Sequence, residues 1–113
     1  MIVGIVGSRT FTDFKKLCDN VESLGLKITG IISGGAAGAD TLAEMFASKY
    51  NIPITVIRPD WNKNGKAAGF IRNGEIVAKS DVILAFWDGV SKGTEDTIKK
   101  ATRYKKTTII IYI

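Results

Sequence analysis

Short apolar runs alternate with longer amphipathic stretches along this chain. The runs rich in β-branched residues predict five buried strands, at 2–6, 30–33, 52–57, 81–87 and 107–113. Apolar residues at helical spacing predict helices between them, at 11–25, 38–50, 70–80 and 93–106. The segment 58–69 has neither period and predicts an irregular loop.

The predicted helices carry apolar faces that identify the side turned toward the sheet. In the first helix, which ends at Gly25, this face comprises Phe14, Leu17, Val21 and Leu24. In the second and third helices the inward residues are Leu42, Met45, Phe46, Tyr50, Ile76 and Val77.

Strands that alternate with helices in this way predict an α/β fold with a parallel sheet and helices on both faces. The expected strand order is 3-2-1-4-5, in a single domain that spans 1–113. In such doubly wound sheets ligands bind beyond the carboxyl ends of the strands, where the order reverses. Here that crevice lies between the first and fourth strands, so candidate residues follow positions 6, 33, 57 and 86.

The stretch after the second strand, SGGAAGAD, holds three glycines, Gly34, Gly35 and Gly38, between Ser33 and Asp40. Glycines at a helix start expose backbone N–H groups, which with the helix dipole attract phosphate. The alternative is that they allow the helix to pack closely on the sheet. Asp40 either complements the helix dipole or accepts hydrogen bonds from ribose hydroxyls.

Similar residues follow the first strand. Gly7 permits a tight turn, Ser8 offers a hydroxyl and Arg9 is able to hold an anion with two hydrogen bonds. The alternative is that Ser8 caps the next helix and that Arg9 is solvated.

The fourth strand leads into a second helix start aimed at the same crevice. It follows Trp87 and offers the hydroxyls of Ser91 and Thr94, the amine of Lys92 and the flexible backbone of Gly93. Two such starts that converge at one switch point predict an anion site there.

The loop after the third strand adds three candidates. Trp61 either stacks on a base or covers the end of the sheet. Arg72 and Asn73 are expected to open the following helix, where Arg72 either reaches a phosphate or forms a surface salt bridge.

Composition narrows the chemistry. The 113 residues include 45% hydrophobic and 24% charged residues, which is typical of a globular domain, and carry a net charge of +5. The chain has no histidine, which excludes His-based acid–base catalysis, and its one cysteine, Cys18, makes a zinc site improbable. We therefore expect neither a metal nor a cofactor.

Composition also bears on location and partners. No apolar run suits a signal peptide or a membrane span, so we expect a soluble protein of the cytoplasm, or of the host cytoplasm if a phage encodes it. Basic residues gather near the end of the last helix, but they lack the series of interleaved aromatic residues that forms a surface for stacking bases. We therefore do not expect this stretch to bind nucleic acid. The basic residues are Lys99, Lys100, Arg103 and Lys106.

The motif series GSR.F, SGGAAGAD, P.W...GKAAG..RN and SD.ILAFWDG.S.GT..TI..A, from Gly7 to Ala101, resembles the SLOG superfamily. This Rossmann-like group includes the LOG enzymes and the DprA-type domains, and the chain resembles most its YspA-like branch of small single-domain proteins from bacteria and phages. The resemblance implies a Rossmann-like fold and a site for nucleotides or nucleotide-derived molecules. It implies that the floor of this site is completed by Gly7, Ser8 and Arg9. The backbone that holds phosphate would be that of Gly34, Gly35, Gly38, Ser91, Gly93 and Thr94.

One position departs from the LOG pattern. By the resemblance, Arg72 matches the arginine beside the glycosidic bond, but the catalytic glutamate position holds Thr97. Glu95 and Asp96 precede it, rotated by roughly 200° and 100° around a helix, and do not replace it. Glycosidic cleavage normally uses a placed carboxylate, so LOG-type hydrolysis is not expected.

Three functions remain open. The first is binding of a nucleotide-derived signal of the ADP-ribose or cyclic-nucleotide type, by a sensor or a phage-type sequestering sponge. The second is a nucleoside-monophosphate phosphoribohydrolase that uses Arg72 with a carboxylate from Asp40, Asp88 or Glu95. The third is a DprA-like DNA-associated module. In each case the apolar strand at 107–113 lies at a sheet edge and predicts a homo-oligomer, most simply a dimer.

Overall fold

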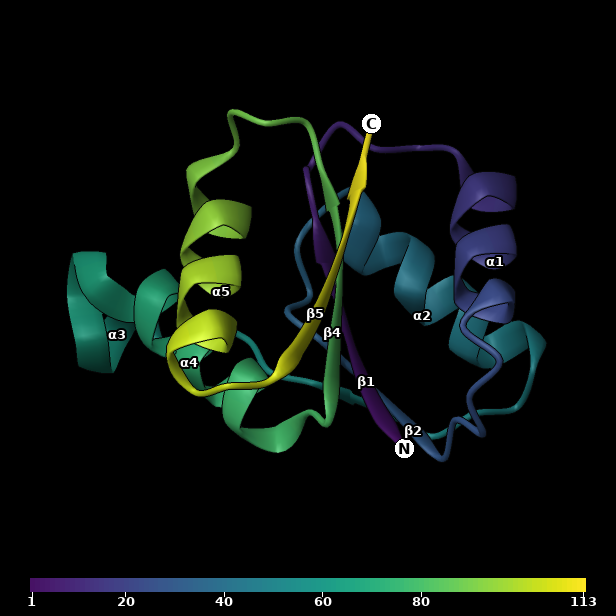
Figure 1. Ribbon diagram of the computed structural model, residues 1–113. Coiled ribbons are helices and arrows are strands. Elements are labelled where there is room, and N and C mark those ends of the chain that lie inside the picture. The colour runs from purple at the N-terminus through teal and green to yellow at the C-terminus, as the bar shows by residue number, and fades with distance from the viewer.

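A computed structural model, which describes residues 1–113, shows one sheet of five parallel strands in the order β3-β2-β1-β4-β5 (Figure 1). The strands are β1 Ile2–Gly7, β2 Gly30–Ser33, β3 Ile54–Val56, β4 Val82–Trp87 and β5 Thr107–Tyr112. The predicted α/β Rossmann-like fold and strand order are confirmed. The order reverses between β1 and β4, which places the expected crevice at their carboxyl ends.

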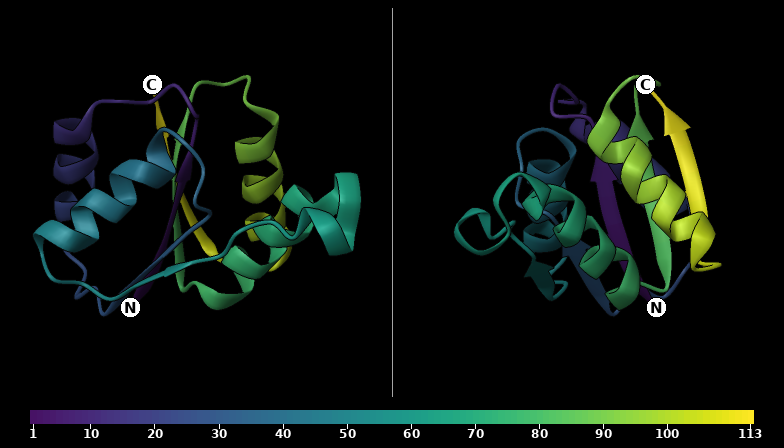
Figure 2. Two further views of the ribbon diagram at one scale, coloured as in Figure 1. Left: turned by 180° about the vertical axis from the view of Figure 1, so that it is seen from behind. Right: turned by 90° about the vertical axis from the view of Figure 1, so that its left-hand side faces the viewer.

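Helices cover both faces of this sheet, as Figures 1 and 2 show. On one face lie α1 Phe14–Ser23 and α2 Ala39–Lys49, and on the other α4 Ala68–Lys79 and α5 Lys92–Arg103. The short helix α3 Trp61–Asn64 and the 3-10 turn η1 Gly65–Ala67 precede α4. None of these helices is long and apolar enough to cross a membrane.

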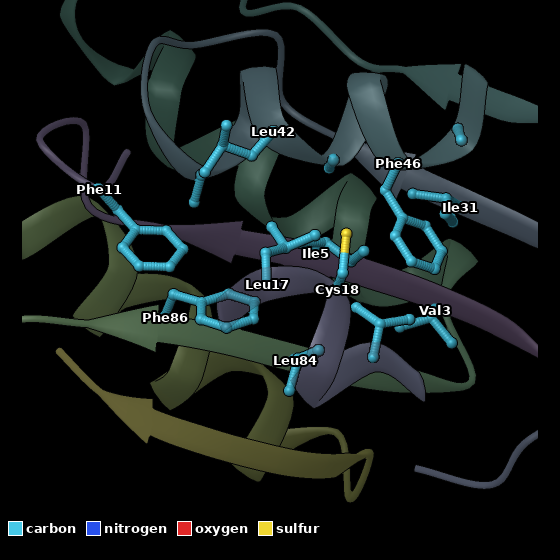
Figure 3. Close-up of a cluster of buried hydrophobic side chains, with 14 residues drawn as sticks. Val3, Ile5, Phe11, Leu17, Cys18, Ile31, Leu42, Phe46, Leu84 and Phe86 are labelled. Atoms are coloured by element: carbon cyan, nitrogen blue, oxygen red, sulfur yellow. The ribbon is translucent and has the colours of Figure 1, made fainter. Parts of the chain in front are cut away.

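The alternation of side chains along the strands divides the core in two. On the α1 and α2 face, Val3 and Ile5 of β1 pack with Leu84 and Phe86 of β4 and with Leu17 of α1 (Figure 3). The rings of Phe11 and Phe86 stack there with centroids 5.0 Å apart, close to the crevice end of β4. Because Phe11 follows Ser8 and Arg9 in the loop after β1, this packing holds that loop against the sheet.

The second core layer lies under α4 and α5. Val6 of β1 and the buried residues of β4 on that face, Ile83 and Ala85, pack against Ile76 and Val77 of α4. The inward orientation of Ile76 and Val77 is confirmed. Because α4 and α5 share this layer, their crevice ends are held against each other.

The predicted inner face of α2 was partly wrong. Leu42 and Phe46 are buried, but Met45 is 47% exposed and Tyr50 is 41% exposed. The stripe that faces the sheet is completed by alanines, which pack closely because they are small. These residues are Ala39, Ala43 and Ala47. Tyr50 lies at the helix end, where its hydroxyl donates to Glu22 instead.

Two boundaries also differ from the prediction. The third strand is only three residues long, because it is an edge strand paired with β2 alone. The segment predicted as an irregular loop contains α3, whose first turn is capped by Asp60, and α4 begins at Ala68. Arg72 and Asn73 therefore lie one turn inside α4 rather than at its start, because the helix already forms through the alanines before them.

Candidate functional site

Two adjoining cavities lie at the carboxyl edge of the sheet, where the crevice was expected. The larger has a volume of about 600 Å³ and the smaller about 340 Å³. Five residues line both and form the boundary between them: Arg9, Ala36, Arg72, Asn73 and Gly93. They lie in the loops after β1 and β2 and in α4 and α5, so the carboxyl edge of the sheet brings them together.

The larger cavity is cationic. Its fourteen lining residues include four basic side chains and no acid, and the basic ones are Arg9, Arg58, Lys66 and Arg72. Two aromatic side chains share it: Trp61 is 57% exposed and Phe70 is 51% exposed. Large aromatic surfaces are normally buried, so two that remain open beside four cations are the chemical signature of this cavity.

The aromatic side chains are placed by the segment that precedes α4 and by α4 itself. Trp61 begins α3, which is held by the side chain of Asp60 accepting a hydrogen bond of 3.1 Å from the backbone N–H of Lys63. Neither α3 nor η1 buries a residue, and Figure 1 shows α3 outside α4, away from the sheet. Phe70 lies in the first turn of α4, whose inward face is used by Ile76 and Val77.

Arg72 is held by hydrogen bonds at the boundary of the two cavities. Its Nε donates to the side-chain oxygen of Asn73 at 3.0 Å, and its Nη1 donates to the carbonyl oxygen of Gly34. No carboxylate lies within ion-pair distance, so the surface salt bridge considered for Arg72 does not form. Burial lowers the pKa of this guanidinium, yet arginine remains protonated in proteins, and the charge faces the cavities.

The glycines after β2 make room for arginine side chains. A Cβ atom at Gly34 would lie 2.6 Å from Nη1 of Arg72, and one at Gly35 would lie 2.7 Å from Nη1 of Arg58. Arg58 donates to the carbonyl oxygen of Gly35 at 3.1 Å, and Gly35 has a φ of +73°. The guanidinium groups of Arg72 and Arg58 therefore pack directly against the backbone of this loop.

Gly38 serves close packing. Its φ is +75°, and a Cβ atom there would collide with the carbonyl groups of Ser8 and Arg9. The next residue, Ala39, donates its N–H to the carbonyl oxygen of Ser8 at 3.3 Å. The start of α2 is thus turned toward the loop after β1, and Gly38 lines neither cavity.

The smaller cavity carries hydroxyls and two carboxylates. Asp40 is only 7% exposed and accepts a hydrogen bond of 3.1 Å from the N–H of Ala36. Burial raises the pKa of Asp40, while the Ala36 N–H and the Arg72 charge oppose that rise. Asp88 accepts from the N–H groups of Val90 and Ser91, which lower its pKa.

The start of α5 is open toward both cavities. Its hydrogen bonding begins with the N–H of Glu95, which donates to Ser91 at 3.1 Å, so the N–H groups at 92–94 precede the first intrahelical bond. A Cβ atom at Gly93 would meet nothing within 4 Å. Thr97, which the resemblance to LOG enzymes aligns with their catalytic glutamate, is buried and donates its hydroxyl to the carbonyl oxygen of Gly93 at 3.2 Å.

Most of the site residues expected from the sequence line one cavity or both: Gly7, Ser8, Arg9, Gly34, Gly35, Asp40, Trp61, Arg72, Asn73, Ser91, Gly93 and Thr94. Five others do not: Ser33, Gly38, Trp87, Lys92 and Glu95. The hydroxyl of Ser33 donates to the backbone of Asp40, and Nε1 of Trp87 donates to Ser91. Glu95 pairs with Lys99 on the surface of α5.

Sequence reasoning missed three side chains of the larger cavity, Arg58, Lys66 and Phe70. Arg58 follows the carboxyl end of β3 closely, so the rule that located the other candidates also applied to it. Lys66 belongs to the segment 58–69, which has neither strand nor helix period, and Phe70 begins the helix predicted at 70–80. Only their three-dimensional placement shows that they line the cavity.

Three comparisons with known proteins agree with this architecture. The family model "YspA, cpYpsA-related SLOG family" matches residues 1–64. The chain is 35% identical over 109 residues to Gene 61 protein of Mycobacterium phage D29, across 88% of this chain and 86% of that protein. The structure is similar to DNA processing protein A (DprA) from Streptococcus pneumoniae, with a TM-score of 0.78 and 18% identity. That match covers 96% of this chain but only 49% of the DprA chain, and it concerns the fold.

Proposed function

Because the chain belongs to the YspA, cpYpsA-related SLOG family, we propose that it binds a nucleotide or a nucleotide-derived signalling molecule in the larger cavity. The ligand class is that of ADP-ribose or a cyclic nucleotide. The observation that carries this proposal is the lining of the cavity, which combines four cations, two open aromatic rings and no acid. A volume of about 600 Å³ falls in the range of small-molecule sites.

In this proposal the phosphates lie at the boundary of the two cavities. Arg9 and Arg72 offer guanidinium groups there, and the open start of α5 at Gly93 offers backbone N–H groups. A base stacks on Trp61 or Phe70, since base–aromatic stacking is worth about 1–3 kcal/mol per base. The hydroxyls and carboxylates of the smaller cavity suit the hydroxyls of a ribose.

We assign the site to binding without turnover. The position that holds the LOG glutamate is a buried threonine, Thr97, whose hydroxyl is already bonded to Gly93. Asp88 is occupied by two backbone N–H groups. A protein that captures the ligand and leaves it intact acts either as a sensor or as a sequestering sponge, and similarity to a phage protein favours the sponge.

A second candidate is hydrolysis of a nucleoside monophosphate, and the observation that favours it is Asp40. Its buried carboxyl has a raised pKa and shares the smaller cavity with Arg72. A carboxyl of that kind is a suitable general acid for glycosidic cleavage. Release of free base and ribose 5-phosphate from AMP, CMP or GMP, lost in Asp40→Asn, would favour this second function over capture.

We also propose that two copies associate through β5. This strand pairs only with β4, and Tyr112 and Ile113 at its end are 65% and 39% exposed. The open edge of a sheet presents unpaired backbone N–H and C=O groups, which form hydrogen bonds with another strand. The β5 strand of a second copy supplies such a partner in a two-fold symmetric dimer.

Isothermal titration with a nucleotide panel tests the binding proposal. The panel comprises ADP-ribose, ADP, AMP, 3′,5′-cyclic AMP and a short single-stranded oligonucleotide. We expect a nucleotide to bind the wild type and binding to fall in Arg9→Gln, because Arg9 makes no hydrogen bond or ion pair of its own and is free for a ligand. The control Arg103→Gln removes the same charge from the far end of α5. If only the oligonucleotide binds, the cavity serves nucleic acid instead.

A further inference from the structure

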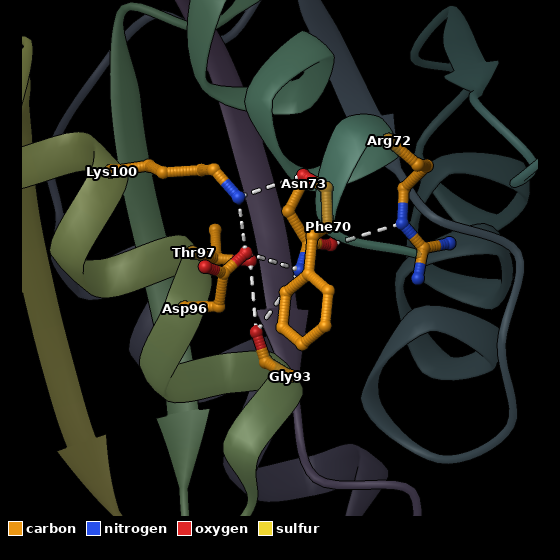
Figure 4. Close-up of polar contacts among 7 residues, drawn as sticks. All are labelled: Phe70, Arg72, Asn73, Gly93, Asp96, Thr97 and Lys100. Carbon is orange, nitrogen blue, oxygen red and sulfur yellow. Dashed lines mark hydrogen bonds and ion pairs between the residues drawn. The ribbon is translucent and has the colours of Figure 1, made fainter. Parts of the chain in front are cut away.

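A chain of polar contacts joins α5 to α4 and ends at the two cavities (Figure 4). Lys100 Nζ lies 2.6 Å from Asp96 Oδ2, and the same carboxylate oxygen accepts a hydrogen bond of 3.1 Å from Nδ2 of Asn73. Oδ1 of Asn73 then accepts from Nε of Arg72 at 3.0 Å. Arg72 lines both cavities, whereas Asp96 and Lys100 line neither.

The orientation of the Asn73 amide is set by these contacts. Its Nδ2 group donates both to Asp96 and to the carbonyl oxygen of Gly93, the latter at 3.2 Å. Two acceptors on this side leave Oδ1 as the atom that faces Arg72, because a flipped amide would oppose acceptor to acceptor and donor to donor. Asn73 is 6% exposed, so it has little water to replace a lost partner.

The same network reaches the aromatic side of the larger cavity. Lys100 Nζ donates to the carbonyl oxygen of Phe70 at 2.8 Å and lies 5.5 Å from the centroid of the Phe70 ring. The start of α5, the Arg72 guanidinium and Phe70 are therefore tied to a single carboxylate.

The Lys100–Asp96 ion pair is more buried than the other two ion pairs of the protein, Lys15–Asp19 and Lys99–Glu95. The side chains of Lys100 and Asp96 are 20% and 23% exposed, against 85% and 58% for Lys15 and Asp19 in α1. An exposed i,i+4 ion pair contributes little to stability, and its side chains separate easily. A largely buried pair that makes further hydrogen bonds keeps its side chains in one geometry.

From this network we infer that Asp96 is a positioning residue for the proposed nucleotide site, acting through Asn73 on Arg72 and through Lys100 on Phe70. The inference rests on the proposed function for its ligand, but the fixed guanidinium is a property of the free protein. The inference predicts that removal of the Asp96 carboxylate weakens the binding of an anionic ligand, which is the opposite of what its charge alone would cause. On Coulomb grounds alone, removal of an acid near a cationic cavity would tighten the binding of an anion.

Titration of ADP at one fixed ionic strength distinguishes positioning from charge. We expect Asp96→Ala to weaken ADP binding about tenfold, the equivalent of one lost hydrogen bond, and Asn73→Ala to weaken it at least as much. Asp96→Asn should remain within about twofold of the wild type, because its Oδ1 still accepts from Asn73. The control Asp19→Ala, which breaks the exposed pair in α1, should leave the Kd unchanged. Tighter binding in both Asp96 variants would overturn the inference.

A measurement on the free protein keeps the inference testable if ADP does not bind. Exchange of the Arg72 Nε–H with water, followed by ¹⁵N NMR, should be slow in the wild type and in Asp96→Asn. It should become several-fold faster in Asp96→Ala and in Asn73→Ala. An unchanged exchange rate in Asp96→Ala would overturn the positioning role, whereas absence of ADP binding with the expected exchange rates would count against ADP as the ligand and leave the positioning role supported.

Discussion

The guanidinium of Arg72 in α4 donates a hydrogen bond to the carbonyl oxygen of Gly34, which lies 38 positions earlier in the chain, directly after β2. This contact links the two sides of the sheet at the edge of the cavities, because α4 lies on one face and the Gly34 loop leads into α2 on the other. It also explains one glycine in the stretch SGGAAGAD: any side chain at Gly34 would meet the guanidinium.

Removal of the open aromatic ring on which the base stacks should weaken nucleotide binding without affecting the fold. We expect at least one of Trp61→Ala and Phe70→Ala to cost about 1–3 kcal/mol of binding free energy through lost base stacking. The melting temperature should change little, because both rings are more than half exposed. Titration and thermal unfolding of the same samples check both statements.

Tyr104→Ala is the matched control for these variants, since Tyr104 is 60% exposed but lies at the far end of α5. Equal loss of affinity in Tyr104→Ala, or full affinity in both Trp61→Ala and Phe70→Ala, would show that the rings do not contact the ligand.

Two glycines at the crevice should respond in opposite ways to alanine. Gly38→Ala should lower the free energy of unfolding by about 3 kcal/mol or more, because the backbone has φ +75° and the new Cβ collides with two carbonyl groups. Gly93→Ala should fold at least as well as the wild type, since its Cβ meets nothing within 4 Å and alanine favours a helix. Urea unfolding measures both, and a stable Gly38→Ala would contradict the packing role.

Asp40 should make the stability depend on pH in a direction that is uncommon for an acid. Burial raises the pKa of Asp40 above its usual 3.8, so the folded state holds this proton more tightly than the unfolded state. The contribution of Asp40 to stability is therefore greatest when it is protonated and falls as the pH rises from the unfolded pKa through the folded pKa.

The variant Asp40→Asn isolates this effect, because its amide oxygen is able to keep the hydrogen bond from Ala36. We expect the wild type to lose stability relative to Asp40→Asn as the pH rises above about 4. Urea unfolding of both proteins across that range gives the difference. A wild type that gains stability over the same range would mean that the Arg72 charge outweighs burial.

Association through β5 should depend on the open edge of that strand. Light scattering of the wild type at micromolar concentration should give the mass of a dimer, and Tyr112→Lys should give a monomer, because a charge on an edge strand opposes pairing. Tyr112 is 65% exposed, so the substitution should leave the melting behaviour of the monomer intact. A monomeric wild type would contradict the proposed interface.

The sheet was predictable because each of its central strands is marked by a short stretch of consecutive residues. Each central strand is a continuous apolar run, such as the buried segment from Val82 to Phe86, and the helices between the strands leave few possible connections. The inner face of α2 was harder to predict. Met45 and Ala43 are only two positions apart, and the larger apolar side chain is the one that hydrophobicity alone assigns to the core. Packing against the sheet chooses the smaller one.

The site was predictable where its residues follow the ends of strands. Arg9 and Gly34 follow that rule, as does Trp61 in the loop after the third strand, and the structure brings all three to one cavity. Lys66 and Phe70 line the same cavity, but no pattern in the sequence distinguishes them as site residues. The Asn73–Asp96 contact joins two helices across 23 positions, and no pattern in a single sequence indicates it.

The most direct test of the central claim is mass spectrometry of small molecules released from the protein after purification from cells and denaturation. If the cationic cavity captures a nucleotide-derived signal, the released fraction should contain a phosphate-bearing nucleoside derivative in near-stoichiometric amount, and its yield should fall in Arg9→Gln but not in Arg103→Gln. A wild-type protein that releases no such compound, even from cells challenged with phage, would contradict the claim.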